Sequence, residues 1–302
     1  MENNTIIRIK DEDYTLIKDY RDIAKYREDI NLLTEATYGF NFEEWYRQGF
    51  WGDRYRPYSL LYHGNIVANI SVNPLEFYAQ GKVQKCLQIG TVMTDVAFRG
   101  KGLSKALMNI VLEEYEKEYE KEYECIYLYA NDTVLDFYPR FGFEREEEYV
   151  HIGYADADTT RYEFVKLELR EEKNKELLLW HIRQAKPCYE YAMLDNPGLI
   201  MFYLNSFLSE NVYYCEELSL MAVAEYEENT LKLTDVFCNH DYNLKEVINS
   251  LATVPGMKVV LGFTPLDTIG FEANPLREEG TTFFTKGKSF LGQGRFPELS
   301  HA

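Results

Sequence analysis

Residues 92–104 read Val92-Met93-Thr94-Asp95-Val96-Ala97-Phe98-Arg99-Gly100-Lys101-Gly102-Leu103-Ser104. The stretch opens as an apolar strand and ends where apolar residues begin to recur at helical spacing, at Leu103, Ala106, Leu107, Ile110, Val111 and Tyr115. Glycines in the turn between them let the backbone bend tightly and expose successive N–H groups, and a helix N-terminus adds roughly half a positive charge. The stretch therefore suits a pyrophosphate, with further charge from Arg99, Lys101 and Lys105.

Two common phosphate-binding motifs are excluded. The pattern G-x-x-x-x-G-K-[ST] is absent, and Lys105 stands where G-x-G-x-x-G needs its third glycine. A glycine turn before a helix is also an ordinary loop in many proteins, so this segment alone does not assign a function.

The surrounding sequence predicts a mixed α/β fold. We expect strands at 6–9, 58–62, 66–77, 85–96 and 125–129, and helices at 14–37, from 103 onward and from 132 to 141. His63-Gly64-Asn65 has the composition of a hairpin turn, and the Glu-rich run 113–124 is typical of a solvated helix face. A helical crossover between residues 85 and 129 implies a parallel strand pair.

The second half of the chain repeats this order of elements. Helices are expected at 175–184, 197–208 and 244–251, and strands at 212–216, 218–226, 231–237 and 258–263. The polar run 156–161 marks the boundary, so we predict two domains, 1–158 and 159–302. The second follows the same order of three strands, a helix and a strand.

The net charge and the composition limit the classes of molecule that the protein is expected to bind. The 302 residues include 50 acidic and 32 basic ones, giving a net charge of −18, which disfavours nucleic acid and favours a cationic partner. No apolar run is long enough for a membrane span, and Met1 to Lys10 contain no secretion signal. Five scattered cysteines without a CxxC pair, and scattered histidines, predict reduced thiols in a cytoplasm and no metal site.

A second motif follows the first in chain order: Asn131, then Phe137-Tyr138, then Gly142-Phe143. Together the two motifs resemble those of the GNAT acyl-CoA N-acyltransferase family, over about residues 1–150. Residues 99–104 match its R/Q-x-x-G-x-G/A signature except at the last position, where Ser104 stands. Serine is small, so close approach of the backbone remains possible.

The resemblance implies acetyl-CoA as co-substrate and names its contacts. Backbone groups of Val92, Met93 and Thr94 are expected to bond the pantetheine arm, and amides of Gly100, Lys101, Gly102, Leu103, Ser104 and Lys105 to hold the pyrophosphate. Asn131 is expected to contact the cofactor, and Tyr138 to protonate the departing thiolate, whose ordinary pKa of ~8.5 makes it a poor anion to release in a dry site. The alternative for Tyr138 is simple packing.

No motif identifies the general base. Asp95 at the end of the motif strand, Glu76 and a water chain all stay open. The apolar C-terminal tail, residues 287–302, adds His301 and the C-terminal carboxylate of Ala302, because in related enzymes that carboxylate serves as base. The alternative is that the tail only patches the second domain.

The second half lacks the cofactor chemistry. His240 and Asp241 stand where a phosphate loop would be, and no Asn…Tyr…Gly-Phe block follows residues 258–263. We predict two tandem GNAT-like domains, the second degenerate, resembling the first two domains of enhanced-intracellular-survival type acetyltransferases. We expect no counterpart of their third, sterol-carrier-like domain after Thr281.

The leading functional hypothesis is transfer of acetyl from acetyl-CoA to a primary amine on a cationic small molecule, such as an aminoglycoside, polyamine or amino sugar. A protein or peptide amine is the alternative within the same chemistry. The rival from another class is a non-catalytic acyl-CoA-binding regulatory module. A homo-oligomer is left open.

Overall fold

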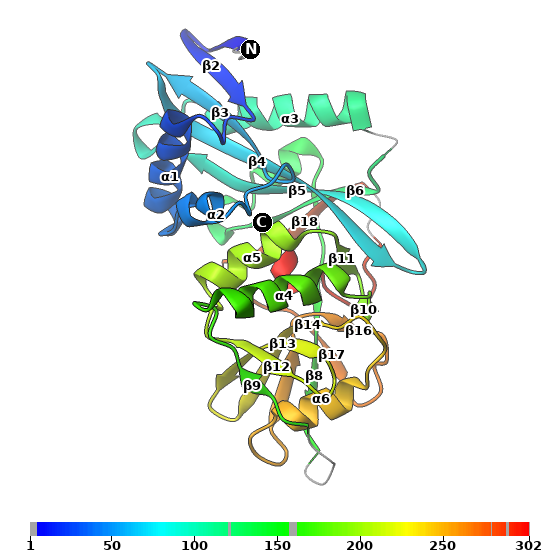
Figure 1. The fold of residues 1–302 in the computed structure, drawn as a ribbon. Coiled ribbons are helices and arrows are strands. Elements are labelled where there is room, and N and C mark those ends of the chain that lie inside the picture. The colour runs from blue at the N-terminus through cyan, green and yellow to red at the C-terminus, as the bar shows by residue number, and fades with distance from the viewer. Residues whose placement is uncertain (1–4, 120–121, 157–161, 279, 288–289, 302) are drawn as a thin grey trace.

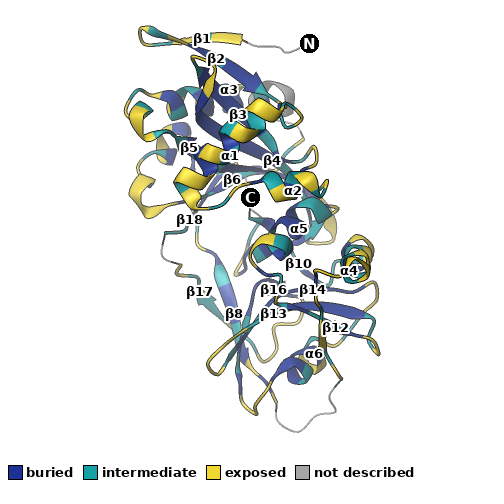
Figure 2. Cartoon of the chain, turned by 60° about the vertical axis from the view of Figure 1, so that its left-hand side comes forward, coloured by how far each residue is buried: buried dark blue, intermediate teal, exposed yellow. Residues whose placement is uncertain are grey.

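A computed structural model describes residues 5–119, 122–156, 162–278, 280–287 and 290–301. The chain forms two mixed sheets, one above the other in Figure 1, with helices packed against each. The central strands of both sheets are largely buried, whereas edge strands such as β1 and the outward faces of the helices are exposed (Figure 2). Across the described residues, no helix is long and apolar enough to cross a membrane.

The first sheet has the order β1-β2-β3-β4-β5-β6-β18-β7, with β11 beside β4. Its strands are β1 (Thr5–Ile9), β2 (Glu12–Lys18), β3 (Arg56–Tyr62), β4 (Asn65–Ala79), β5 (Lys82–Thr94), β6 (Cys125–Ala130), β7 (Glu144–Arg145), β11 (Ala192–Leu194) and β18 (Thr282–Gly287). The pair β5–β6 is parallel, as the helical crossover predicts, and its neighbours in the sheet are antiparallel.

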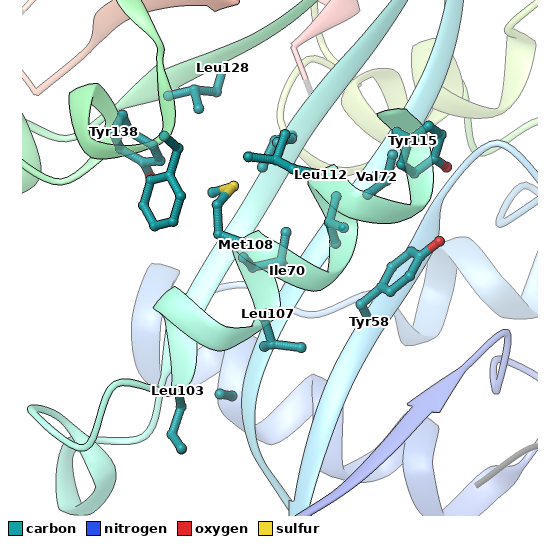
Figure 3. Packing of buried hydrophobic residues seen from close by; sticks show 14 of the residues in the cluster. Tyr58, Ile70, Val72, Leu103, Leu107, Met108, Leu112, Tyr115, Leu128 and Tyr138 are labelled. Carbon is teal, nitrogen blue, oxygen red and sulfur yellow. The ribbon is translucent and has the colours of Figure 1, made fainter. Parts of the chain in front are cut away.

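Two layers of helix cover this sheet. Helix α3 (Leu103–Tyr119) lies on one face, where Leu107, Met108 and Leu112 pack on Ile70 and Val72 of β4 (Figure 3). Helices α1 (Ala24–Tyr38) and α2 (Glu43–Arg47) cover the other face around an aromatic-rich core of Phe42, Trp45, Trp51 and Tyr55. The high aromatic content of the sequence thus goes largely into the core.

Two predicted helices in this half differ from the structure. The helix expected at 14–37 begins only at Ala24, because Tyr14 and Leu16 alternate into the core on strand β2. The helix expected after Asp132 is broken into two 3₁₀ turns, η2 (Asp132–Val134) and η3 (Tyr138–Phe141). The predicted stop at Gly142 is confirmed, with that residue at φ 80°.

The second sheet has the order β17-β8-β15-β14-β13-β12-β9. Its strands are β8 (Tyr149–Tyr154), β9 (Val165–Lys166), β12 (Val212–Cys215), β13 (Leu220–Glu227), β14 (Thr230–Phe237), β15 (Lys258–Leu261) and β17 (Glu272–Pro275); β10 (Tyr189–Glu190) and β16 (Thr264–Pro265) form a separate pair. Helices α4 (Glu172–Gln184), α5 (Pro197–Ser206) and α6 (Leu244–Leu251) complete this half. Its one parallel pair, β14–β15, flanks the crossover helix α6, so the predicted repeat of element order is confirmed.

The two sheets exchange strands across the predicted boundary at 158/159. Strand β8 precedes that boundary yet pairs with β15 of the second sheet, and β18 follows it yet pairs with β6 of the first. Each sheet therefore receives, beside its parallel pair, a strand from the other half of the chain. A polar run marks a boundary only where each sheet uses one continuous stretch of chain; residues 157–161 themselves lie outside the described residues.

The C-terminal tail lies between the two sheets. Phe296 stacks between Phe77 of β4 and Tyr127 of β6, with ring centroids 4.4 and 4.6 Å away. The Glu298 amide donates to the Gly262 carbonyl of the second half at 2.9 Å. The tail is non-helical apart from the short turn η4 (Glu298–Ser300), as predicted. It joins both halves, so the expectation that it only patches the second domain is wrong.

Candidate active site

Strands β5 and β6 separate at the centre of the first sheet. Their parallel pairing ends at Ile89 and Leu128, although β5 continues to Thr94 and β6 to Ala130. The separation follows a bulge in β5, where the register with β4 shifts and Thr91 adopts φ 40°. A bulge bends a strand and raises its twist, so the last residues of β5 leave the sheet.

A buried hydrogen-bond network holds this bulge in place. The Tyr55 hydroxyl lies 2.9 Å from Thr91 Oγ1, which donates to Ser71 Oγ at 2.6 Å. Asn69 Nδ2 donates to the Thr91 carbonyl at 2.9 Å and accepts, through Oδ1, from Ser59 at 2.8 Å. These polar side chains are satisfied by each other, so the opening between the strands is a fixed feature of the sheet.

A cleft of 550 Å³ runs from the last residues of β5 to the start of α3. Of the residues predicted for cofactor or catalysis, it is lined by Val92, Met93, Thr94, Arg99, Gly100, Gly102, Leu103, Ser104, Lys105 and Tyr138. The two sequence motifs, separated by a helix and a strand, thus meet around one cavity.

The glycine loop presents open backbone at one end of this cleft. Gly100 and Gly102 have φ of 76° and 90°, which other residues rarely adopt, and a Cβ built on either would meet no atom within 4 Å. The first turn of α3 leaves the amides of Leu103, Ser104 and Lys105 without helical partners. Ser104, where the family signature has Gly or Ala, lies 2.7 Å through its hydroxyl from Thr94 Oγ1. That contact ties the strand end to the helix start.

Two predicted cofactor residues turn away from the cleft. Lys101 Nζ donates to both carboxylate oxygens of Glu12, the nearer at 3.1 Å, and lies 4.8 Å from the Phe98 ring. Asn131 Oδ1 accepts from the Thr133 amide at 3.0 Å and from its hydroxyl at 2.8 Å, so it caps turn η2. The ammonium group of Lys101 therefore pairs with a carboxylate of β2. Neither the Lys101 nor the Asn131 side chain lines the cleft.

Tyr138 is held by aromatic packing. Its ring is 4% exposed and lies 5.2 Å from Phe137 and 5.8 Å from Phe284, centroid to centroid. Burial, with a smaller contribution from Tyr38, raises the pKa of Tyr138 well above its ordinary value of 10. The phenol therefore stays protonated at neutral pH and can donate a proton into the cleft. Figure 3 shows Tyr138 at the edge of the α3-side core.

Asp95 and Glu76, two of the candidate general bases, lie outside the cleft wall. Asp95 Oδ1 accepts from the Ala97 amide at 2.8 Å and so caps a short turn. Glu76 lies eight residues along β4 from Ala68, the partner of Thr94, which places it roughly 26 Å from that end of the cleft at 3.3 Å per residue. Neither carboxylate is among the residues that line the cleft.

His301 is close to the opening, in contrast. Its ring stacks on Tyr129 of β6 at 3.8 Å, and the Tyr203 hydroxyl donates to its carbonyl. Burial, followed by Arg295 and Lys232, lowers the pKa of His301 well below 6.5. The C-terminal carboxylate belongs to residue 302, which lies outside the described residues.

Several residues that line the cleft were not predicted from the sequence. Phe98, Thr133, Val134, Phe137, Arg140 and Phe141 share the cleft wall, as does Thr37 of α1. Those of the second motif lie within five residues of Tyr138 along the chain, a closeness in sequence that could have indicated them. Thr37 could not be found in this way, because only tertiary packing brings α1 to the cavity.

In the second half, β14 continues past its parallel pairing with β15, which ends at Leu233, and Asp235, Val236 and Phe237 line a smaller cavity of 110 Å³ there. The tail packs at the end of β15, where Thr264 Oγ1 donates to the Arg295 carbonyl at 3.1 Å and the Glu298 amide donates to the Gly262 carbonyl. His240, at the loop before α6, has Nε2 2.9 Å from the Leu218 carbonyl. In the part of the chain that the structure describes, no three His, Cys, Asp or Glu side chains form a group that could hold a metal ion.

The model of the acetyltransferase (GNAT) domain matches residues 23–145, the stretch that contains both motifs. These residues form a GNAT domain. None of the curated protein sequences compared with the chain matches it. The GNAT domain belongs to an acetyltransferase family, and its cleft in this chain lies between a glycine loop at the start of α3 and a buried phenol.

Solved structures share the fold over both halves. A probable N-acyltransferase of unknown function from Enterococcus faecalis V583 superposes with a TM-score of 0.60 at 13% identity, covering 95% of this chain and 73% of that one. Eis1 from Mycobacterium abscessus gives 0.56 at 12% identity, covering 86% and 71%. A GCN5-related N-acetyltransferase from Kribbella flavida gives 0.55 at 17% identity, covering 90% and 71%. The chain thus has the arrangement of GNAT proteins along most of its length.

Proposed function

We propose that the protein transfers an acetyl group from acetyl-CoA to a primary amine on a cationic small molecule. One observation carries the proposal: a single cleft joins the open amides of the glycine loop to the Tyr138 phenol at the point where β5 leaves β6. Acetyl-CoA supplies an activated thioester and a diphosphate, which match the two ends of this cleft in chemistry.

The loop end is suited to the diphosphate. The amides of residues 103–105 point out of the helix start, and the positive φ of Gly100 and Gly102 leaves open space where side chains would otherwise project. Arg99, Lys105 and Arg140 line the same cavity and add positive charge to a protein of net charge −18.

The strand end is suited to an amide-containing arm. On one side, β5 stays paired with β4 at Met93 and Thr94; on the other side, residues 92–94 have no β6 partner, so backbone groups that face that side are free of the β6 ladder. The Tyr38 hydroxyl donates to the Val92 carbonyl at 3.3 Å and would have to share or release it. The Thr94 carbonyl likewise accepts from Arg99 Nε at 3.4 Å, so we assign the arm to the backbone of residues 92–94 without preference among them.

Tyr138 is the proposed general acid. A phenol kept neutral by burial can give its proton to a thiolate as the carbon–sulfur bond breaks, and such acid catalysis contributes typically ~10²–10⁴-fold.

Aromatic side chains beside the cleft support a cationic acceptor. Tyr38 is 48% exposed and stacks on Phe40, which meets Phe207 of the second half edge-on at 5.8 Å. Such faces attract cations, and the net charge of −18 acts in the same direction. A peptide amine remains the alternative acceptor, and a regulatory acyl-CoA-binding module the alternative function.

A mass-spectrometric screen tests the proposal. The protein is incubated with acetyl-CoA and, separately, polyamines, amino sugars, aminoglycosides and lysine peptides, with the Tyr138→Phe variant as matched control. We expect a polycationic small amine to gain the mass of one acetyl group. The amount of this product should be lower with the Tyr138→Phe variant. Acetylation of peptides alone would move the acceptor to the alternative class. Tight acetyl-CoA binding with no product from any amine would favour the regulatory module.

A further inference from the structure

A buried polar cluster lies under the first sheet, on the side facing the second half of the chain. Glu148, in the segment between β7 and β8, is 5% exposed, and Arg295 of the tail is 2% exposed. Glu148 Oε1 accepts from the Tyr129 hydroxyl and from the Phe296 amide, each at 3.1 Å. His301 stacks on the same tyrosine. Nothing in the chemistry described so far uses this carboxyl group.

Tyr129 places the cluster at the opening of the sheet. It follows Leu128, the last residue of β6 that pairs with β5, and so stands where the two strands part. Unlike Glu148, Tyr129 is only partly buried. The tyrosine thus lies between the opening of the sheet and the buried carboxyl group.

Strand alternation sets Tyr129 and Tyr138 on opposite faces. Leu128 and Ala130 pack with Tyr138 in the α3-side core, whereas Tyr127 and Tyr129 pack with Phe283 and Phe296 on the other side. A thioester lying in the opening would have a phenol on each side, one near its sulfur and one near an incoming amine. Of these two phenols, Tyr129 donates a hydrogen bond to a carboxylate, that of Glu148.

We propose that Tyr129 and Glu148 form a proton relay that takes the proton from the acceptor ammonium on the face of the sheet opposite Tyr138. This rests on the proposed function and supplies the base that the motifs do not identify. Tyr129 contacts the amine, and Glu148 acts through it.

Each proton that leaves one group in the relay is accepted by the next. One N–H bond of the ammonium breaks, and its proton passes to Tyr129 Oη while the original Tyr129 O–H proton passes to Glu148 Oε1. Tyr129 remains a neutral phenol, the amine gains a free electron pair for attack on the carbonyl carbon, and Glu148 becomes a carboxylic acid. Glu148 releases that proton to solvent after the product leaves, which matches the one proton liberated when an ammonium becomes an amide.

The groups around Glu148 fit this role. Burial raises the pKa of Glu148 from 4.5 to about 7, against the lowering influence of Arg295 and of the hydrogen bonds from Phe296 and Tyr129. The other titratable or charged groups facing the relay are Tyr127, Glu278, Lys232 and His301. A carboxyl that titrates near neutrality can both accept and release a proton at that pH. His301 is held neutral by its depressed pKa and is a weaker base.

The pH dependence of kcat/KM for the acceptor tests the relay. Glu148→Gln retains an oxygen that can accept both hydrogen bonds but no basic group. We expect the wild-type acid limb near pH 7 to disappear, with a loss of about 10²–10⁴-fold at pH 7 that narrows toward pH 10 as the free amine becomes abundant. Tyr129→Phe should reproduce this profile, while KM for acetyl-CoA stays unchanged in both variants.

The matched control is Glu147→Gln, an exposed neighbour paired with Arg277 at 2.7 Å, which should keep the wild-type limb. His301→Phe preserves the ring stack and removes the ring nitrogens. An unchanged acid limb in Glu148→Gln, or a limb lost in His301→Phe and kept in Glu148→Gln, would overturn the relay. If the wild type acetylates no amine, the proposed function fails instead, so the two failures are distinguishable.

Circular dichroism and thermal unfolding at pH 6 separate catalysis from folding. Glu148→Gln should be folded as well as the wild type, because glutamine is isosteric and uncharged in a buried site. If it is not, Glu148→Asp supplies the second test: it keeps the acid but shortens its reach, and the relay predicts an acid limb at reduced rate. An acid limb at full rate in Glu148→Asp would contradict the 3.1 Å contact as the proton path.

Discussion

Tyr129 and Tyr138 lie on opposite faces of one sheet, on either side of the place where β5 and β6 part. Tyr138 packs among Phe137, Phe143 and Phe284 with no charged neighbour in its ring contacts, whereas Tyr129 donates to the carboxylate of Glu148. The first environment favours a phenol that gives up a proton, and the second favours one that passes a proton on. The two steps of an acyl transfer to an amine are thereby assigned to separate sides of the sheet.

Replacing Tyr138 by phenylalanine should lower kcat by about 10²–10⁴-fold with little change in acetyl-CoA affinity. The ring contacts with Phe137 and Phe284 survive, and only the proton donor is lost. Steady-state kinetics measure the first quantity and calorimetry the second. Tyr115→Phe, in the same core but outside the cleft, is the control for loss of a buried phenol. A fall of less than about threefold, far below the range for acid catalysis, would make Tyr138 a packing residue.

Gly102→Val should abolish acetyl-CoA binding, because its side chain would project into the space that the loop leaves open. The φ of 90° also strains valine, so some loss of stability is expected in addition. Gly64→Val is matched for that strain, since Gly64 has φ 82° in a hairpin turn with equally open space and lies outside the cleft. Calorimetric titration should show binding by the second variant alone. Equal affinity in both would remove the loop from the cofactor site.

The stability of the protein should fall as the pH rises from about 5 to 8. The folded-state pKa of Glu148 lies at about 7, above its unfolded value of 4.5. Its stabilising contribution is therefore complete below pH 4.5 and is lost as the pH rises through 7. Asp235, whose buried carboxyl has its pKa raised from 3.8 to about 7, acts in the same direction.

Urea unfolding at a series of pH values measures this effect. Glu148→Gln should remove up to about 3 kcal/mol of the decline, at 1.4 kcal/mol per unit of pKa difference. In Glu147→Gln the decline should persist, because that exposed carboxyl has its pKa lowered by Arg277 instead. An identical decline in Glu148→Gln and wild type would show that the carboxyl titrates alike in both states.

A fragment ending at residue 158 should not fold on its own. It would lack β18, which pairs with β6 at six positions and supplies Phe284 to the α3-side core. It would also expose β8, whose partner β15 lies in the other half. Proton NMR should show poor dispersion for residues 1–158 and recovery when residues 159–302 are co-expressed. A dispersed spectrum from the fragment alone would contradict the exchange of strands as a requirement for folding.

Features that depend on residues close together in the sequence could be predicted. Residues 92–104 contain apolar, glycine and helical patterns that all act over a few neighbours, and both the parallel pair and the start of α3 follow from them. Tyr138 was found through its position in a motif. The direction of the Lys101 side chain could not be predicted, because the sequence does not show that Glu12 lies within reach of its ammonium group.

Features that depend on distant segments were out of reach. The Asn69–Thr91 hydrogen bond that fixes the bulge joins two strands. The sequence around either residue does not predict this bond. The position of β18 between β6 and β7 depends on chain segments about 150 residues apart. Glu148 stands in an acidic run, Glu146-Glu147-Glu148, that reads as solvent-exposed, and only the tail that covers it makes it a buried acid.

A crystal structure of the protein with CoA bound tests the central claim most directly, through the position of the CoA sulfur. The account predicts that the sulfur lies in the opening between β5 and β6, within hydrogen-bonding reach of Tyr138 Oη directly or through one water, with the diphosphate on the amides of residues 102–105. A CoA molecule bound elsewhere, or bound in this cleft with its sulfur turned away from Tyr138 and the strand opening, would contradict it.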